Sequence, residues 1–355
     1  MSSNCSMMFC RVAALACMLA WSASAPAEDA ARPAEAKPAA AEAKPSGEAK
    51  PPVTSPAKAE PTPAEVEYRL HMRDAKEAYQ KGDFARAESE SALAVKTAET
   101  FAPQDDRLIA AIEKQSMIYT VQNKFAAAEA PARCMVEVCE KVKGADSPAV
   151  AAALNNLGAI AKSAGKLADA EAIYNRALAI VEKLPEAKGA AAMILGNLAE
   201  LYRDQGKLAE AEQTVKRAIA ILEKSTGPGQ YYLTENLHVL GTIYTAEKKH
   251  VEAMAAHQRA YDLRRKTQFW NRLVMMESLT YLADANKAAG KLAEAEPLYK
   301  QALTLGQDSV GPTDPRLLPA LKGYADLLRK LKRDDEAKVY EDRAGVIGGP
   351  GAPKQ

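Results

Sequence analysis

The sequence predicts an all-α protein built as an α-solenoid. Apolar residues recur at intervals of three and four on both sides of a series of turns, which is the spacing of amphipathic helices. Alanine dominates the apolar residues while aromatic residues make up only 6% of the chain, which favours closely packed helices over sheets. Seven similar segments follow one another at steps of 41 or 42 residues. A repeat of that kind stacks into a solenoid.

Each copy is expected to be a pair of antiparallel helices joined by one turn residue. The seven turn residues are Gly82, Asn123, Gly165, Gly206, Lys248, Gly290 and Lys332. Glycine, and after it asparagine, ends a helix at low cost because it adopts a left-handed backbone conformation. The two lysines are expected to accept the same conformation with a modest penalty.

Small residues recur at fixed places and predict where the helices cross most closely. A small side chain is needed where two helix backbones approach each other. In the first helices these residues are Gly158, Ala199, Gly241, Ala283 and Ala325. In the second helices they form an alanine ladder of Ala87, Ala128, Ala170, Ala211, Ala253, Ala295 and Ala337.

These features resemble the tetratricopeptide repeat, and specifically the subtype of about 42 residues found in kinesin light chain and in many bacterial proteins. The segment "LNNLGAIAKSAGKLADAEAIYNRALAI" and the inter-repeat loop "GPTDP" carry the resemblance. It covers residues 64–346 and implies a right-handed superhelix of about seven repeats, of which the first and last are degenerate. HEAT repeats have a similar period but do not require the alanine ladder, so they are a distant second interpretation.

The first 63 residues differ from the repeats. Arg11, the apolar run "VAALACMLAW" and the small residues after it predict a signal peptide over residues 1–27. Residues 28–63 contain no aromatic residue and are rich in Ala, Pro, Lys and Glu, which predicts a disordered tether. Residues 347–355 are expected to form a flexible tail. We therefore expect export to the periplasm or cell envelope without a transmembrane segment in the mature chain, and lipid anchoring at Cys17 is a minor alternative.

Charge and motifs argue against several function classes. The 47 basic and 46 acidic residues nearly cancel, so the chain lacks the overall positive charge of a nucleic-acid binder. Gly290 and Lys291 lack the second glycine and the hydroxyl residue of a phosphate-binding loop. The four histidines do not have metal-ligand spacing, and no serine stands in a "GxSxG" motif. We predict no enzyme activity, no cofactor and no metal. Cys134 and Cys139 are expected to be buried small hydrophobic residues.

The resemblance implies that a protein or peptide segment binds in the concave groove lined by the first helices. Asparagine amides suit a peptide backbone because each offers donors and an acceptor. The alternative interpretation of these positions is a solvated helix face. Carried onto this sequence, the groove residues are Asn155, Asn156, Lys162, Asn197, Glu200, Arg203, His238, Thr242, Thr280, Asp284, Lys287, Lys322, Asp326 and Arg329.

A second candidate surface is the basic and aromatic segment "RRKTQFWNR". Arg264, Arg265, Phe269 and Trp270 could form a docking edge through cation-π and guanidinium contacts. The alternative makes Trp270 a packing anchor for the connection between copies five and six. The function that these patterns favour is an exported, non-enzymatic scaffold for a protein or peptide partner. The alternative function is a structural spacer or self-associating module of the cell envelope with no peptide ligand.

Overall fold

The computed structural model describes residues 61–102, 105–224, 228–266 and 271–348. Within these ranges it contains fourteen α-helices and no strand, which confirms the predicted all-α class. The helices are α2 (Pro63–Gln80), α3 (Phe84–Ala98), α4 (Asp106–Val121), α5 (Phe125–Lys143), α6 (Pro148–Ser163), α7 (Leu167–Val181), α8 (Lys188–Asp204), α9 (Leu208–Leu222), α10 (Pro228–Ala246), α11 (His250–Lys266), α12 (Arg272–Ala288), α13 (Leu292–Val310), α14 (Leu318–Lys330) and α15 (Asp334–Gly348). Two short 3₁₀ helices, Pro185–Ala187 and Pro315–Leu317, precede α8 and α14.

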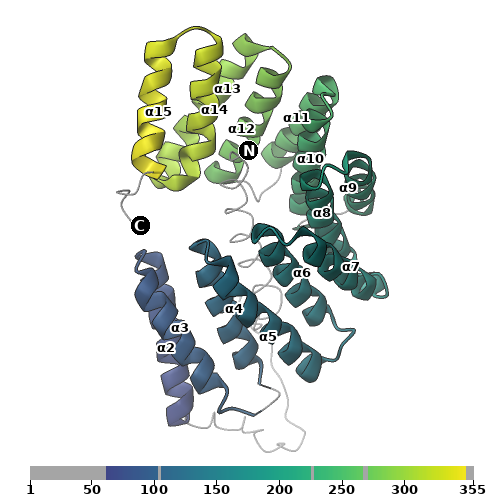
Figure 1. Cartoon of the computed structure of the whole chain (residues 1–355), viewed down its shortest axis with the longest axis vertical. Coiled ribbons are helices and arrows are strands. Elements are labelled where there is room, and N and C mark those ends of the chain that lie inside the picture. The colour runs from purple at the N-terminus through teal and green to yellow at the C-terminus, as the bar shows by residue number, and fades with distance from the viewer. Residues whose placement is uncertain (1–60, 103–104, 225–227, 267–270, 349–355) are drawn as a thin grey trace, which may run out of the picture.

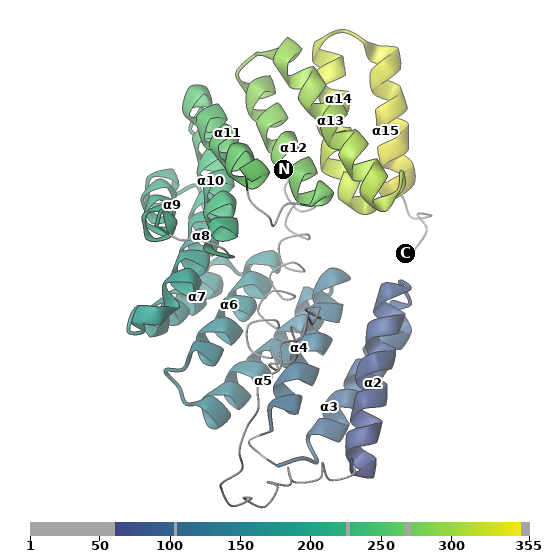
Figure 2. The same ribbon diagram turned by 180° about the vertical axis from the view of Figure 1, so that it is seen from behind.

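The fourteen helices form seven antiparallel pairs that stack into an open arc (Figure 1). Within a copy the two helices pack against each other, and the second helix of each copy packs against the first helix of the next. The two end copies, α2 with α3 and α14 with α15, lie on the same side of the arc, and α9 lies on the opposite side. Figure 2 shows the same arrangement from behind. The structure thus has the solenoid architecture that the repeat period predicts.

All seven predicted turn residues have a left-handed backbone. The four glycines have φ between 72° and 78°. Asn123 and Lys248 have φ of 61° and Lys332 has φ of 57°, so non-glycine residues hold the same conformation. The prediction that these residues end the first helix of each copy is confirmed, since each follows a first helix by two residues.

Local sequence also explains where several first helices begin. The side chain of Thr62 accepts a hydrogen bond from the Glu65 amide, and the Glu65 carboxylate accepts one from the Thr62 amide, which closes a capping box on α2. The Ser147 and Asn271 side chains cap α6 and α12 with one hydrogen bond each, which they accept from the amides of Val150 and Val274. These caps satisfy amides that have no partner inside the helix.

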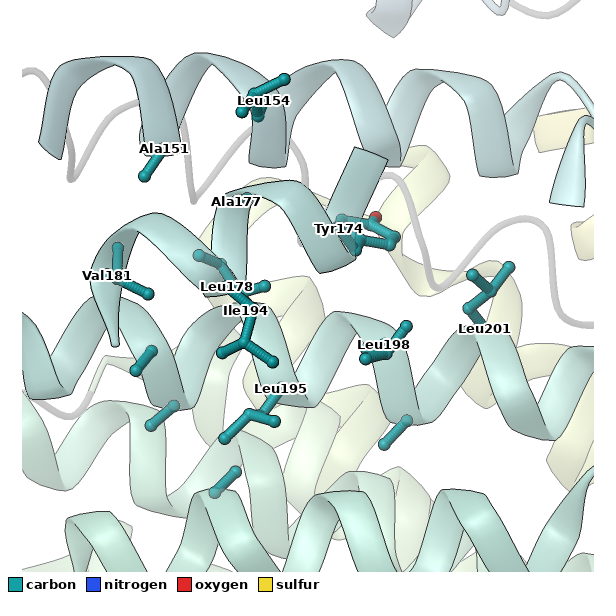
Figure 3. Packing of buried hydrophobic residues seen from close by; sticks show 14 of the residues in the cluster. Ala151, Leu154, Tyr174, Ala177, Leu178, Val181, Ile194, Leu195, Leu198 and Leu201 are labelled. Atoms are coloured by element: carbon teal, nitrogen blue, oxygen red, sulfur yellow. The ribbon is translucent and has the colours of Figure 1, made fainter. Parts of the chain in front are cut away.

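The alanine ladder is the centre of each copy. All seven ladder residues, from Ala87 to Ala337, have no exposed surface. The predicted small residues of the first helices also lie at contacts: a Cβ atom added to Gly158 would come within 2.7 Å of the Tyr174 ring, and one added to Gly241 within 2.4 Å of the His257 ring. Figure 3 shows how side chains of α6, α7 and α8 fill the space between copies three and four.

The apolar core is divided along the solenoid. One cluster of buried residues runs from Ile112 to Ala260, which covers copies two to five. A second runs from Met276 to Ile347 and covers copies six and seven. Two small clusters lie around copy one. The division between the two large clusters falls at the junction of α11 with α12.

The prediction for the cysteines is correct for one of the two. Cys139 is buried, whereas Cys134 is exposed, and both are free thiols. Five residues along a helix turn the side chain to a different face, so only Cys139 faces the neighbouring helix. None of the helices in the described ranges has a stretch long and apolar enough to cross a membrane.

Candidate functional site on the inner face

The first helices lie toward the inside of the arc. In Figure 1, α6 and α8 are on the inner side and α7 and α9 on the outer side. We call the surface of α2, α4, α6, α8, α10, α12 and α14 that faces the inside of the arc the inner face. The predicted groove residues all belong to α6, α8, α10, α12 and α14.

Several predicted groove residues connect one first helix to the next. Lys162 Nζ on α6 lies 2.9 Å from Glu200 Oε2 and 3.5 Å from Asp204 Oδ2 on α8. Arg203 Nη1 on α8 donates to Thr242 Oγ1 on α10 at 2.9 Å. Each contact joins residues 38 to 42 positions apart, close to one repeat period. We call such contacts, together with the one described next, the inner rungs.

The third inner rung joins copies six and seven. Lys287 Nζ on α12 lies 3.1 Å from Asp326 Oδ2 on α14 and 3.1 Å from Asp284 Oδ1 on its own helix. It also donates to the Gly323 carbonyl at 3.2 Å. The rungs therefore hold neighbouring copies in register. Lys162 and Lys287 already form ion pairs with carboxylates of the same chain.

Five of the predicted groove residues are buried. Lys162 and Glu200 have side chains only 3% and 8% exposed, so they form a buried ion pair. Thr280 donates to the Met276 carbonyl one turn earlier at 2.8 Å. A ligand on the inner face would not reach these side chains without a rearrangement. The five residues are Asn155, Lys162, Glu200, His238 and Thr280.

Amide side chains stand on the first helices α6, α8 and α10. Asn197 Nδ2 donates to Asn155 Oδ1 at 2.8 Å. Asn236 Nδ2 donates to the Tyr232 carbonyl at 2.9 Å. Asn155 Nδ2 and Asn236 Oδ1 have no hydrogen-bond partner among the described residues. This amide row, Asn155, Asn156, Asn197 and Asn236, therefore has more hydrogen-bonding capacity than the chain itself uses.

The other nine predicted residues form the accessible set of the inner face. Lys322, Asp326 and Arg329 on α14 are exposed, and the rest are partly exposed. Arg329 Nε and Nη2 donate to both carboxylate oxygens of Glu341, at 3.0 and 2.8 Å, and this pairing raises the pKa of the guanidinium. Asp284 accepts a hydrogen bond from the Tyr299 hydroxyl, whose pKa is raised mainly by burial. The accessible set is Asn156, Asn197, Arg203, Thr242, Asp284, Lys287, Lys322, Asp326 and Arg329.

The predicted docking edge divides between buried and exposed side chains. Arg264 is buried and donates to Glu235, to Ser278 Oγ at 2.6 Å and to the Val274 carbonyl at 2.9 Å. It therefore connects α10, α11 and α12 instead of facing a partner. The guanidinium of Arg265 is exposed and lies 5.7 Å from the centre of the Tyr261 ring. Phe269 and Trp270 lie outside the described residues.

Arg264 belongs to a largely buried polar network that the sequence patterns did not predict. His238 Nδ1 and His257 Nδ1 are 3.0 Å apart, and His238 Nε2 is 3.0 Å from Ser278 Oγ. The Tyr281 ring stacks on both imidazoles. We call Glu235, His238, His257, Arg264 and Ser278 the polar joint. A signal existed in the repeat alignment, because Ser278 stands where the other copies after the first carry Ala111, Ala153, Ile194, Asn236 and Ala320.

In chemical terms these residues support binding and packing. The described ranges contain no group of three or more His, Cys, Asp or Glu side chains that could hold a metal ion. Gly290 and Lys291 lie in a turn between two helices, and a phosphate-binding loop stands between a strand and a helix. The inner face thus offers amides, hydroxyls and charges of both signs along adjacent helices.

Comparison with known proteins agrees with this architecture. A sequence profile of the tetratricopeptide repeat matches residues 108–183, 190–266 and 274–344, which together make up more than half of the chain. No curated protein sequence matches significantly.

Solved structures with low sequence identity share the fold. The apo form of RapI is 15% identical, with 78% of this chain and 96% of that chain covered and a TM-score of 0.55. BtubC (BKLC) from P. vanneervenii is 19% identical, with 71% and 94% covered and a TM-score of 0.50. A putative kinesin light chain from Podosopora anserina is 20% identical, with 59% and 98% covered and a TM-score of 0.47. The chain belongs to the tetratricopeptide repeat family.

Proposed function

We propose that this protein is an exported, non-enzymatic scaffold that binds a protein or peptide segment along its inner face. The tetratricopeptide repeat is in general a protein-interaction fold, and repeat arrays present extended surfaces to their partners. Export is inferred from the signal-like sequence of residues 1–27, which lie outside the described residues.

The observation that carries the binding proposal is the amide row. Asn156 is partly exposed and makes no hydrogen bond among the described residues, and Asn197 uses its Nδ2 group but has a free acceptor. A peptide backbone presents alternating donors and acceptors, and amide side chains can pair with both. Asn156 and Asn197 lie on α6 and α8, where neighbouring copies are held in register by the buried Lys162 and Glu200 pair. A rigid support of this kind lowers the entropy lost on binding.

The charge of the accessible set restricts the partner. Arg203, Lys287, Lys322 and Arg329 are basic, and Asp284 and Asp326 are acidic. Because Lys287 already pairs with both acids, a strongly acidic or strongly basic segment would meet like charges or displace the inner rung. A mixed-charge segment bound mainly through its backbone fits this face best.

Capture experiments test the proposal. Crosslinking and pull-down of the native protein from its own cell envelope should recover a protein partner. Substituting Asn156→Ala together with Asn197→Ala should reduce capture about tenfold, equivalent to roughly 1.4 kcal/mol. Gln213→Ala, an exposed amide on the outer helix α9, is the matched control and should leave capture unchanged. Unchanged capture by the double variant would refute the assignment to the inner face.

A further inference from the structure

A ladder of ion pairs follows the edge of the solenoid where the turns within each copy lie. In five of the six junctions, a basic residue directly after the turn residue pairs with a glutamate on the second helix of the preceding copy. In the remaining junction Met254 replaces the glutamate opposite Lys291. The pairs of this turn-edge ladder are Lys124 with Glu88, Lys166 with Glu129, Lys207 with Glu171, Lys249 with Glu212 and Arg333 with Glu296.

The two ends of the ladder carry the opposite charges. The first copy has Asp83 where every later copy has a lysine or arginine, and the last copy has Lys338 where five earlier copies have a glutamate. Asp83 accepts a hydrogen bond from the Arg86 amide at 3.1 Å. Neither Asp83 nor Lys338 forms an ion pair within the described residues, and Lys338 is exposed. Each end therefore offers a charge that the other end could neutralise.

The first copy also exposes apolar surface at a place that the other copies cover. Leu70 on α2 is 43% exposed. The residues at the same place in the later copies lie against the preceding copy and are buried: Ala111, Ala153, Ile194, Asn236, Ser278 and Ala320. Val66, one turn before Leu70, is equally exposed. This surface of α2 is the one with which a first helix contacts the copy before it.

We propose that the first copy of one chain docks head to tail onto the last copy of a second chain, as successive copies dock within a chain. The surface around Leu70 would then lie against the last copy, and Asp83 would pair with Lys338 as a ladder rung of reversed polarity. The charge of Lys338 also disfavours docking of the last copy against any copy other than the first. In every later copy the residue after the turn is basic and would repel Lys338. Such a heterologous contact closes into a ring or extends into a filament, depending on the rotation between chains.

The test measures the mass of the full chain by sedimentation over a range of protein concentrations at low and physiological salt. The mass should rise with concentration, and more so at low salt, because the pair is at the surface. Asp83→Lys and Lys338→Glu should each weaken association at least about tenfold, since like charges would then face each other. The double variant should restore association. Each substitution introduces the residue that most other copies carry at that place, so the fold should tolerate it.

The controls make every outcome decisive. Asp169→Lys makes the same charge change at an exposed site in the middle of the solenoid and should leave the mass unchanged. Leu70→Glu should weaken association without involving the ladder. A single-chain mass at all concentrations, association that survives both single reversals, or failure of the double variant to restore it would each overturn the proposal. None of these results depends on whether a peptide binds the inner face.

Discussion

The junction between copies three and four and the junction between copies five and six use the same places in the repeat but fill them differently. In the first, Val181 on α7 and Ile194 on α8 are buried apolar residues (Figure 3). In the second, Arg264 stands at the place of Val181 and Ser278 at the place of Ile194. One junction is an apolar contact, and the other is the polar joint.

This difference divides the solenoid into two apolar blocks, copies two to five and copies six and seven. In a repeat array each copy contacts only its neighbours, so stability is close to a sum of copy and junction contributions. A buried polar network adds little net free energy compared with apolar packing, but it strongly penalises the loss of one member. We therefore expect the polar joint to be the place where the two blocks separate most easily.

The largest expected effect is that of Arg264→Leu. Removing the guanidinium takes the shared donor away from the partly exposed Glu235 and the buried Ser278, and breaking a largely buried pair of this kind destabilises by about 4 kcal/mol. Urea unfolding followed by circular dichroism should change from one transition to two as the blocks uncouple. Arg265→Leu, an exposed neighbour on the same helix, should stay within about 0.5 kcal/mol of the wild type. A single unshifted transition for Arg264→Leu would show that the joint does not couple the blocks.

A similar substitution in the apolar block should have a smaller effect. Lys162→Met should destabilise by about 3 kcal/mol because Glu200 stays buried after losing the Lys162 ammonium, and the exposed Asp204 nearby loses the same partner. Adding Glu200→Leu should recover most of the loss, since an apolar pair of similar size can replace a buried ion pair.

The exposed pair of Lys166 with Glu129 is the control for this cycle. Lys166→Met should change the free energy of unfolding by less than about 1 kcal/mol. If Lys166→Met were as destabilising as Lys162→Met, burial of the inner rung would not explain its strength. Thermal and urea unfolding of the three variants and the wild type measure both comparisons.

The repeat period, the turn residues and the alanine ladder were enough to predict the architecture, because each is a local backbone or packing requirement that recurs in every copy. The partners of the inner-face residues were not predictable in the same way. A polar residue such as Lys162 or Thr280 has the same helical position whether it faces solvent or the neighbouring first helix. Burial there depends on the rotation between copies, which the sequence of one copy does not specify.

The contacts within the polar joint were likewise not predictable from the sequence of one copy. His257 stands where Tyr174 and Tyr299 pack in other copies, and it is buried as they are. It also contacts His238 of the same copy. His238 and Arg264 in turn both contact Ser278 of the next copy. The five residues of the polar joint form a network only because α10, α11 and α12 meet there.

An intermediate effect is expected from overpacking the apolar block. Ala211 on the alanine ladder has no exposed surface, so Ala211→Leu forces the crossing of α8 and α9 apart and should destabilise by about 1 to 3 kcal/mol. Ala220→Leu on the exposed side of α9 is the matched control and should be nearly neutral. Equal melting temperatures for the two variants would show that the ladder crossing has room for a larger side chain.

The smallest expected effect is a loss of stability in acid that both blocks share. Hydrogen bonds from Lys216 and Lys249 lower the pKa of Glu212 from 4.5 to about 2, and those from Lys300 and Arg333 do the same for Glu296. A carboxylate whose pKa is lowered by folding stabilises the protein above its unfolded pKa, and this contribution is lost as the pH falls from about 4.5 to about 2. Because the partners are exposed, each glutamate should contribute only about 1 kcal/mol.

Glu212→Gln and Glu296→Gln isolate the two contributions, one in each block. Each variant should be slightly less stable than the wild type at pH 7 and should lose less stability on acidification, because the substituted site no longer binds a proton. Urea unfolding at pH 7, 4 and 3 measures this difference. If acid destabilised the Glu212→Gln protein as steeply as the wild type, the ion pair of Glu212 with Lys249 in the turn-edge ladder would contribute nothing to the pH dependence. A steep loss confined to one of the two variants would instead place the acid-sensitive contacts in a single block, which would deepen the contrast between them.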